Sequence, residues 1–561
     1  MPELDVRINL PVAERLPPRP AATVVLLRGA SRGPELLMLR RTKGASHFGG
    51  SYVFPGGMVD PEDEAPAMLR RVVGLGKDEA NRRLGVDSGG LRHWVAVVRE
   101  CYEEAGILLA VDEALQPLAP ARVAGFESAR TALNKGTLSF REFLERERLL
   151  LPAHAVNYFS HWITPPVQKR RFDTRFFLAH APAGQQGLHD DGEMVDAVWL
   201  PAEEALARAG RKEMNMAFPT RQVLLSVKKF ATPEEAVSHV RSLTVIISNR
   251  PCFAEGRDGR KMFRPGEAPY AEIHWTDPDE LGTTSYDISP GVAKKLDRFV
   301  TRITAPNPGV MTGPGTNTYL VGEKELAVID PGPAEPAHVA AILAAGGKRI
   351  RWILCTHTHR DHSPAAALLK HATGAQILGR PAPQAPNHDQ SLAVDHPLAH
   401  GEALEFDGIS LRAVFTPGHA SNHLCYLLDR TRMLFTGDHV MQGSTVVIWP
   451  PDGNMAAYLG SLKHLLELDL AILAPGHGYL IGHPHAEVDR LLDHRLAREQ
   501  KVRNALAGAG GRATLEALLP FVYDDVPASI HPVAARSLQA HLEKLIDDGE
   551  VSLQQDTYCS R

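Results

Sequence analysis

The stretch that most constrains the fold of this 561-residue chain is "RWILCTHTHRDHS", where four potential metal ligands follow a short apolar run. The four are His357, His359, Asp361 and His362. If the run 351–355 is a strand that continues as extended chain, residues 357, 359 and 361 project to one side, while His362 turns toward a neighbouring position. Such a geometry suits two adjacent metal ions. The pattern therefore predicts a metal site rather than isolated surface histidines.

Three further candidate ligands lie where other apolar runs end. His419 lies in "VFTPGHAS", Asp438 in "LFTGDHV" and His477 in "LAPGHG". Imidazole and carboxylate groups without a thiolate favour zinc, with manganese or iron as alternatives. Two such ions would bridge a water, lower its pKa to near neutrality, and stabilise charge on the attacked and leaving oxygens. The sequence thus favours a hydrolytic centre with two metals.

Taken together, these residues resemble the metallo-β-lactamase superfamily, with HxHxDH, a later "PGH", a "TGD" and a final "PGHG". The resemblance implies a four-layer αβ/βα sandwich and two Zn²⁺ ions. One ion would be held by His357, His359 and His419, the other by Asp361, His362 and His477, with Asp438 bridging and Asp361 also catalytic.

Asp330, in "AVIDPG", matches the family's early strand motif. It is interpreted either as a residue that orients a ligand histidine or as a turn residue before Pro-Gly. His423 and His439 follow ligands closely in the sequence, and the alternatives for them are substrate contacts or ordinary loop histidines.

Longer stretches narrow the resemblance within this superfamily. "NPGVMTGPGTNTYLVG", "TPGHASNHLCYLL" and a tail with three helical patterns resemble the beta-lactamase-like protein two branch, whose animal member is an endoribonuclease. The superfamily acts on lactams, thioesters and phosphodiesters, so its motifs do not choose a substrate. The helical patterns followed by the strand-like "EVSLQQ" predict a small winged helix.

A second group of carboxylates occurs in "VVRECYEEAGI", near the N-terminus. Glu100, Glu103 and Glu104 lie at offsets that stack them on one face of a helical turn. With Arg99 before them and Gly106 after, they resemble the second half of the Nudix box. The family pattern is Gly, five residues, Glu, seven residues, then Arg-Glu-apolar-x-Glu-Glu-x-Gly-apolar.

The first half of that box lies in "FPGGMVDPEDE", where Gly57 is followed after five residues by Asp63 in place of Glu. Between Asp63 and Arg99 lie 35 residues where the pattern has seven, so 28 are inserted, with a helical pattern. An insertion of this length is tolerable if the two halves still meet in space.

An interrupted box also occurs in the peroxisomal coenzyme A diphosphatase branch of the Nudix family, which "LLMLRRT", "GGSYVFPGG" and "HWITPPVQKRRFDTRFFLA" resemble as well. The resemblance implies an α/β/α sandwich. It also implies Mg²⁺ or Mn²⁺ held by Glu100, Glu103 and Glu104, with Glu103 and Glu104 catalytic.

Other charged residues of this region have two interpretations each. Glu193 is a candidate further ligand or a plain surface residue. The cluster Lys169, Arg170 and Arg171 would meet substrate phosphates or form a solvated face.

The length of the chain and its motifs predict an α/β multidomain protein, because 561 residues exceed one ordinary core. We expect a Nudix domain over 18–245 with its insertion at about 64–98, a linker over 246–296, a metallo-β-lactamase domain over 297–494 and a winged-helix-like domain over 495–561. From Lys501 onward, six basic residues stand against eight acidic ones. A duplex-reading domain is normally basic, so packing or formation of a homo-oligomer is the expected role of the tail.

Charge and composition limit the partners and the cellular compartment that we expect. A net charge of −5 gives no general electrostatic case for nucleic acid, and five scattered cysteines without CxxC spacing exclude a disulfide framework. The N-terminal "MPELDVRINLPVAERLPPRP" lacks the apolar core of a secretory signal, and no apolar run approaches the length of a membrane span. We therefore expect a cytoplasmic protein with no membrane partner.

The resulting hypothesis is a tandem metal-dependent hydrolase. A dizinc site would hydrolyse a thioester or an RNA phosphodiester, and a Nudix site would hydrolyse the diphosphate of a coenzyme A-like or nucleotide substrate. Acyl-coenzyme A and RNA each suit both sites. In the alternative, the interrupted Nudix domain is a binding or regulatory module, and a single metallo-β-lactamase-fold site acts as the hydrolase or endoribonuclease. Packing of Gly57–Asp63 against the Glu100 helix would favour two catalytic sites.

Overall fold

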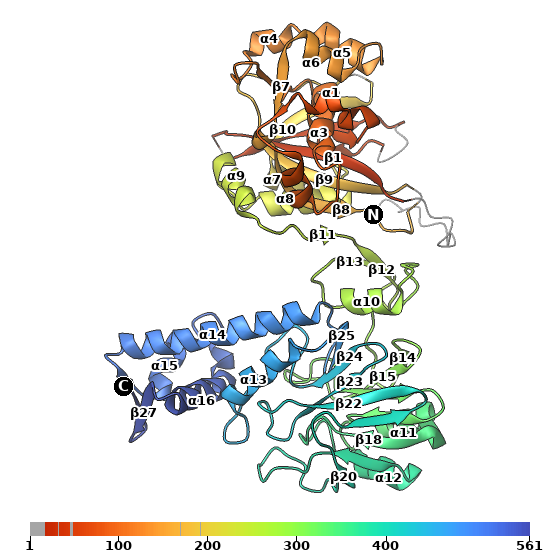
Figure 1. The fold of residues 1–561 in the computed structure, drawn as a ribbon, viewed down its shortest axis with the longest axis vertical. Helices are drawn as coiled ribbons and strands as arrows, with labels where there is room; N and C mark the ends of the chain where they lie inside the picture. Colours follow the sequence, from red (N-terminus) through yellow and green to blue (C-terminus); the bar gives the residue numbers. More distant parts are fainter. Residues whose placement is uncertain (1–16, 32, 45–48, 169, 191) are drawn as a thin grey trace. The chain divides into compact units, whose positions relative to one another are not determined.

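The computed structural model describes residues 17–31, 33–44, 49–168, 170–190 and 192–561 of the chain. They divide into two compact units, with the boundary between Pro251 and Cys252 (Figure 1). Each unit has its own buried core. Lys169, one of the three residues of the expected basic cluster, lies outside the described residues.

The first unit is built on one large mixed sheet. The strands of this unit are β1 (Arg19–Arg28), β2 (Glu35–Arg41), β3 (Tyr52–Val53), β4 (Gly56–Met58), β5 (Val72–Val73), β6 (Val111–Asp112), β7 (Leu149–Pro152), β8 (Asn157–Ile163), β9 (Phe172–His180), β10 (Met194–Pro201) and β11 (Ser248–Asn249). The sheet follows the order β10-β2-β1-β9-β8-β11, with β3 on β2 and β4 on β1, and β5, β6 and β7 pair separately. The runs "ATVVLLRGA" and "PELLMLRRT" form β1 and β2, as their apolar composition predicts.

Helices cover both faces of this sheet. They are α1 (Pro66–Leu69), α2 (Lys77–Leu84), α3 (Arg92–Ala105), α4 (Pro120–Ala124), α5 (Glu127–Asn134), α6 (Phe140–Arg146), α7 (Ala202–Gly210), α8 (Phe218–Val227) and α9 (Pro233–Ser242). Along β1, Val24 and Leu26 pack with α3, whereas Val25 and Leu27 pack with α7, α8 and α9. Successive side chains of a strand point to opposite faces, so one apolar strand serves two cores. The result is the expected α/β/α sandwich.

Two sheets packed face to face form most of the second unit. The first follows the order β14-β15-β16-β17-β18-β19-β20 and the second the order β21-β22-β23-β24-β25. Their bounds are β14 (Ala293–Lys295), β15 (Val300–Thr304), β16 (Asn317–Gly322), β17 (Leu326–Ile329), β18 (Ile350–Leu354), β19 (Gln376–Gly379), β20 (His396–Pro397), β21 (Ala403–Phe406), β22 (Ile409–Phe415), β23 (Leu424–Leu428), β24 (Met433–Gly437) and β25 (Ile472–Pro475).

Helices cover the outer face of each of these sheets. The helices of the second unit are α10 (Tyr270–Thr276), α11 (Pro336–Gly346), α12 (Ala366–Thr373), α13 (Met455–Leu465), α14 (Pro484–Gly508), α15 (Leu515–Val522) and α16 (His531–Asp547). Between the sheets, the rings of Tyr319 and Phe435 lie 5.0 Å apart. Outside them, α11 and α12 pack on the first sheet and α13 and α14 on the second. This is the four-layer αβ/βα sandwich that the family resemblance implied.

The C-terminal segment adds a winged helix with its own buried cluster. The end of α14, α15 and α16 pack together with a small sheet of β26 (Arg512–Ala513), β27 (Val551–Gln554) and β28 (Thr557–Ser560), in the order β26-β28-β27. The expected boundary of the tail at residue 495 falls inside α14, which runs unbroken through that position. The long helix therefore belongs both to the outer layer of the sandwich and to the winged helix.

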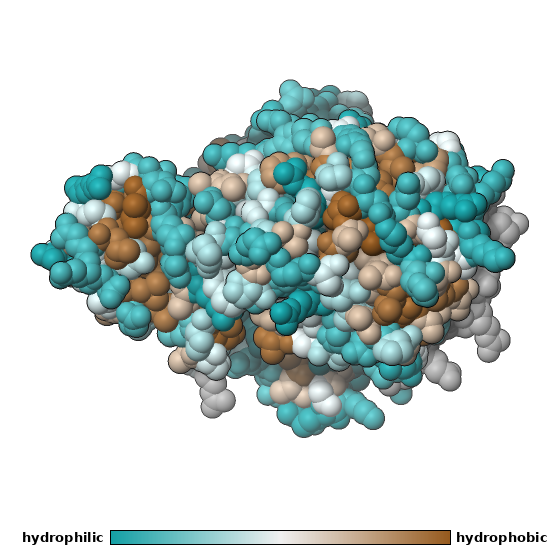
Figure 2. All heavy atoms as spheres, turned by 90° about the horizontal axis from the view of Figure 1, so that it is seen from below, coloured by the Kyte–Doolittle hydropathy of each residue, from teal (hydrophilic) through white to brown (hydrophobic). Residues whose placement is uncertain are grey.

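None of the helices in the described ranges combines the length and apolar character that crossing a bilayer requires. On the face shown in Figure 2, hydrophobic side chains lie in several separate patches among hydrophilic ones.

Residues 252–296, expected within a linker, form structure that belongs to the second unit. The segment holds β12 (Cys252–Ala254), β13 (Lys261–Phe263), α10 and β14. Glu272 of α10 is fully buried and accepts hydrogen bonds from Arg302 at 2.9 Å, from Lys294 at 2.6 Å and from the Leu480 backbone at 3.1 Å. Hydrophobic periodicity did not predict these elements because they are short. The segment is held to the rest of the unit by the buried charges of Glu272, Arg302 and Lys294 rather than by a long apolar face.

Glu272→Gln should lower the free energy of unfolding of the second unit by about 3–5 kcal/mol, because Arg302 and Lys294 then lose their buried anion. Urea denaturation, followed by hydrogen exchange in β15 peptides, measures this. Although burial raises it, the charges of Arg302 and Lys294 lower the pKa of Glu272 from 4.5 to about 2. The contribution is therefore complete above pH 4.5 and is lost as the pH falls toward 2.

The matched control is Asp258→Asn, which removes a surface ion pair with Lys261. It should leave the exchange of β15 unchanged. Equal effects of the two substitutions would contradict a structural role for the buried triad.

Candidate metal centres

The first group of ligand atoms consists of three imidazole nitrogens. His357 and His359 lie in the loop that follows β18, and His419 lies in the loop that follows β22. His357 Nε2 is 2.9 Å and His419 Nε2 is 3.1 Å from His359 Nδ1. Three nitrogens so close face a common point and could hold one metal ion.

The second group is formed by Asp361, His362 and His477. Asp361 Oδ2 lies 3.5 Å from His362 Nε2 and 3.4 Å from His477 Nε2. His477 follows β25, which is parallel to β24, so the carboxyl ends of both strands meet at one edge of the second sheet. These three side chains also form a group that could hold a metal.

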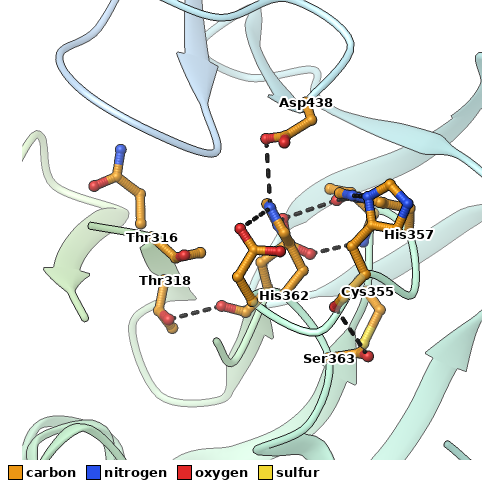
Figure 3. A network of polar contacts seen from close by, with 12 residues as sticks. Thr316, Thr318, Cys355, His357, His362, Ser363 and Asp438 are labelled. Atoms are coloured by element: carbon orange, nitrogen blue, oxygen red, sulfur yellow. Dashed lines mark hydrogen bonds and ion pairs between the residues drawn. The ribbon is translucent and has the colours of Figure 1, made fainter. Parts of the chain in front are cut away.

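Asp438 lies between the two groups, directly after β24. Its Oδ1 is 3.4 Å from His362 Nε2 and 3.3 Å from His477 Nε2, and its Oδ2 is 3.8 Å from His419 Nε2. Figure 3 shows the carboxylate pointing at the ring of His362. One carboxylate therefore reaches toward both groups.

Three buried atoms and one glycine test whether this cluster fits metal ions. His362 Nε2, His477 Nε2 and Asp438 Oδ1 make no hydrogen bond with any residue that the structure describes. Leaving such an atom unsatisfied costs about 1–3 kcal/mol, which coordination would offset. A Cβ on Gly476 would lie 2.7 Å from Asp438 Oδ1 and 2.8 Å from His362 Cε1, so only glycine leaves this space open. The residues of this cluster therefore fit bound metal ions.

Electrostatics of the cluster also suit cations. Burial lowers the pKa of His357 well below its usual value and that of His359 to about 3, so these rings are neutral and have lone pairs to donate. Burial would also lower the pKa of His477, but Asp438 and Asp361 raise it to about 9. The two carboxylates thus stabilise positive charge at the second group.

Asp330 orients His362 and the loop that bears the ligands. Its Oδ2 lies 2.9 Å from His362 Nδ1, and its two oxygens accept hydrogen bonds from the Thr356 backbone at 2.7 Å and the Thr356 hydroxyl at 2.8 Å. The residue has a φ of 49°, a left-handed conformation that aspartate tolerates better than most residues. Of its two interpretations, the structure supports the orienting residue.

The strand-end pattern missed two residues beside the first group. His388 is buried, its Nδ1 lies 2.7 Å from the Thr358 hydroxyl, and its Nε2 lies 3.0 Å from Asp452 Oδ2. Its ring lies 4.6 Å from that of His359. His388 does not follow an apolar run, and only the surplus of polar residues in "PNHDQ" hinted at it. Asp452 is separated from the run "VVIW" by two prolines.

The two loop histidines with open interpretations are both fully buried. His423 Nδ1 lies 2.9 Å from the Thr416 hydroxyl, and the ring of His439 lies 4.8 Å from that of Tyr458. Full burial does not favour the role of a substrate contact.

The two halves of the interrupted Nudix pattern meet in the first unit. Arg99 of α3 donates two hydrogen bonds to the buried carboxylate of Asp63, at 3.0 and 2.9 Å, and one to the Met58 carbonyl at 2.9 Å. A Cβ on Gly57 would lie 2.5 Å from the Glu100 carboxylate, so β4 approaches α3 as closely as glycine permits. The insertion holds α1, α2 and the start of α3, and it brings the chain back to this point.

The glutamates of α3 are partnered within the first unit. Arg99 donates to Glu100 at 2.9 Å and to Glu103 at 3.2 Å, while Glu104 accepts from the Gly56 backbone at 2.9 Å. Burial raises the pKa of Glu100 to about 7, and burial together with the Glu100 charge raises that of Glu104 well above its usual value. Two buried carboxylates that repel one another favour a bound cation, although the three glutamates do not form one compact ligand group among the described residues.

The structure also places Glu193 and two residues of the expected basic cluster. Glu193 is half exposed and pairs with Arg41, and its charge adds to the raised pKa of Glu104. It therefore lies near the glutamates of α3. Arg171 donates to the Thr164 carbonyl at 3.1 Å, and Arg170 is exposed.

Comparison with known proteins gives matches along most of the chain. Family models match residues 311–477 (Metallo-beta-lactamase superfamily), 514–558 (Beta-lactamase associated winged helix domain) and 88–224 (NUDT19 Nudix domain). The Nudix match begins after the segment Gly57–Asp63.

Individual relatives match the second half of the chain over most of their own length. Lactamase-like protein adaB of Aspergillus niger is 31% identical over 51% of this chain and 92% of its own. The Beta-lactamase-like protein 2 homolog of Drosophila melanogaster is 30% identical over 46% and 91%, respectively. The Atrochrysone carboxyl ACP thioesterase of Aspergillus chevalieri is 33% identical over 47% and 86%.

Asp63→Ala should lower the free energy of unfolding of the first unit by about 3–5 kcal/mol, because it leaves the buried Arg99 guanidinium without its bidentate partner. Hydrogen exchange of α3 amides during denaturation reports the change. Asp60→Ala is the control, because the Asp60 side chain is 56% exposed and its carboxylate lies farther from Arg99, at 3.6 Å, than that of Asp63 does. If α3 exchanges alike in both variants, Asp63 does not join the two halves.

Proposed function

Because the chain belongs to the metallo-beta-lactamase superfamily and also carries a Nudix domain, we propose that it is a tandem metallohydrolase with two separate active centres. The matches confirm both resemblances inferred from the motifs, and hydrolysis is the reaction common to the two families. In the proposal, His357, His359 and His419 would hold one Zn²⁺, Asp361, His362 and His477 would hold a second, and Asp438 would contribute to both. Glu100, Glu103 and Glu104 would hold Mg²⁺ or Mn²⁺.

The observation that carries the proposal is the position of the Asp438 carboxylate between two groups of buried ligand atoms. A structural metal site closes around its ion, whereas a catalytic site keeps an open position. Asp361 is 30% exposed, against 0% for His362 and 3% for His477, so the second group opens on the Asp361 side. Substrate would approach from there.

Three side chains of the metal centre in the second unit have a defined role in this proposal. When bound, the two ions would supply a water of lowered pKa and polarise the oxygen under attack. Asp361, at the open side, would accept a hydrogen bond from the attacking water and fix its direction. Asp330 holds His362 through Nδ1 and leaves Nε2 as the donor to the metal.

A thioester is the substrate class that we propose for the second unit. Two relatives are named as thioesterases, the Atrochrysone carboxyl ACP thioesterase and Thioesterase pkgB. An acyl-coenzyme A contains both a thioester and a diphosphate, so one molecule would suit both centres. The Nudix centre would then cleave the diphosphate, with Glu103 and Glu104 catalytic and Arg99 holding the carboxylates in place.

The close approach of Gly57 and Asp63 to α3 supports catalysis at the Nudix centre over a purely regulatory domain. A binding module would not require a glycine against the Glu100 carboxylate or a buried Asp63–Arg99 pair. The insertion leaves the spatial pattern intact although it separates the halves in the sequence.

His359→Ala should reduce the transition-metal content of the purified protein from about two ions per chain to one or fewer, because this ring contributes to the first group of three. Elemental analysis by mass spectrometry measures the content. His371→Ala, an exposed histidine of α12, is the control and should keep both ions. A parent protein without transition metals, or an unchanged content in His359→Ala, would refute the ligand assignment.

Glu103→Gln should slow Mg²⁺-dependent diphosphate hydrolysis by at least about 100-fold and leave thioester hydrolysis unchanged, because the two centres lie in separate units. Product analysis with coenzyme A, acyl-coenzyme A and single-stranded RNA as substrates tests both activities, with Glu127→Gln on the exposed face of α5 as control. Equal loss of both activities would contradict independent centres. Cleavage of RNA but not of the thioester would replace the proposed substrate class of the second unit.

A further inference from the structure

The loop between β24 and α13 fixes the orientation of one proposed ligand. His419 Nδ1 lies 2.8 Å from the carbonyl oxygen of Val447. A ring N–H that donates to a carbonyl leaves the other nitrogen unprotonated and pointing at the metal. The backbone at Val447 therefore determines where His419 Nε2 lies.

The residues on either side of Val447 are held by the C-terminal helices. Arg495 of α14 donates a hydrogen bond to the Val446 carbonyl. The Ile448 backbone N–H donates to the Ser537 hydroxyl of α16 at 3.5 Å. Contacts of the loop with α14 and α16 thus flank the carbonyl that receives His419.

The third contact is a stacked pair at the edge of the loop. The guanidinium of Arg536 lies 3.2 Å from the centroid of the Trp449 ring. Trp449 is 39% exposed, whereas Val446 and Ile448 are buried in a cluster that also contains Ala540 of α16. Arg536 therefore secures the one large side chain of the segment 446–449 that the core does not enclose.

We propose that the winged helix is a positioning element of the metal centre, acting through Arg536 and Ser537 on the segment 446–449 and so on His419. The inference rests on the proposed function, because it takes His419 as a metal ligand. It gives the tail a role that its charge allows: Arg536, one of only six basic residues after position 500, is engaged with Trp449. A ligand held through one backbone carbonyl responds to small movements of that backbone.

The experiment measures how fast metal leaves the protein. Full-length protein is loaded with Zn²⁺ and mixed with a chromophoric chelator, and the release of each ion is followed by absorbance. Arg536→Ala should speed the release of one of the two ions by about 10-fold, because His419 loses its fixed orientation. Arg536→Lys should restore much of the parent rate, since an ammonium can still stack on Trp449.

Two further variants separate positioning from general damage to the fold. Ser537→Ala removes one hydroxyl from the same helix and should speed the same phase to a smaller extent. Arg512→Ala, an exposed arginine of the same winged helix, should release both ions at the parent rate. Thermal unfolding of the metal-free proteins should coincide for all variants.

The outcomes distinguish this inference from the proposed function. If His419→Ala loses an ion but Arg536→Ala and Ser537→Ala release metal at the parent rate, the winged helix does not position the centre and the ligand assignment stands. If the parent protein binds no Zn²⁺, the proposed function itself fails. If Arg512→Ala speeds release as much as Arg536→Ala, the effect is not specific to the loop contact and the inference is overturned.

Discussion

The second unit depends on one constraint, which is that a carboxylate and several imidazole nitrogens must lie within a few ångströms of one another in a buried place. Asp438 lies 3.3–3.8 Å from three of those nitrogens. Burying polar atoms without partners is costly, so the surrounding fold has to over-determine their positions. Asp330 holds His362, Val447 holds His419 and Gly315 faces His477 Nδ1 at 3.2 Å. Each of these partners comes from a different part of the chain, which explains why both sheets and the segment before α13 are needed.

The first unit meets a related constraint in another way. Its carboxylates are gathered on one turn of α3, and the Arg99 guanidinium neutralises part of their charge. Glu100 and Glu104 remain buried close to each other, and burial raises the pKa of both. A cation at this place would relieve their repulsion.

The second unit also contains a buried charged group held by several partners, the triad around Glu272. This triad binds α10 to the backbone of Leu480, three residues after His477.

Much of this arrangement could be predicted from the sequence, because a ligand residue that directly follows an apolar run indicates both a buried strand and a site at its end. The runs around His357, Asp438 and His477 became β18, β24 and β25, and their ligands converge. His388 and Asp452 were missed, since each follows irregular chain and becomes important only through contacts across the fold. The segment 252–296 was missed for a similar reason: Glu272 binds Arg302 and Lys294, a tertiary contact that leaves no periodic pattern. The motif identified Asp63 and Arg99 as parts of one pattern, but the sequence left open whether the insertion allows them to meet, and only the structure shows their contact.

We propose that two metal ions lie on either side of the Asp438 carboxylate. Anomalous diffraction at the zinc absorption edge, from crystals of the full-length protein grown with Zn²⁺, tests it most directly. We expect two peaks about 3.5–4 Å apart, one beside His357, His359 and His419 and the other beside Asp361, His362 and His477. A single peak enclosed by four protein ligands, or peaks remote from Asp438, would contradict it.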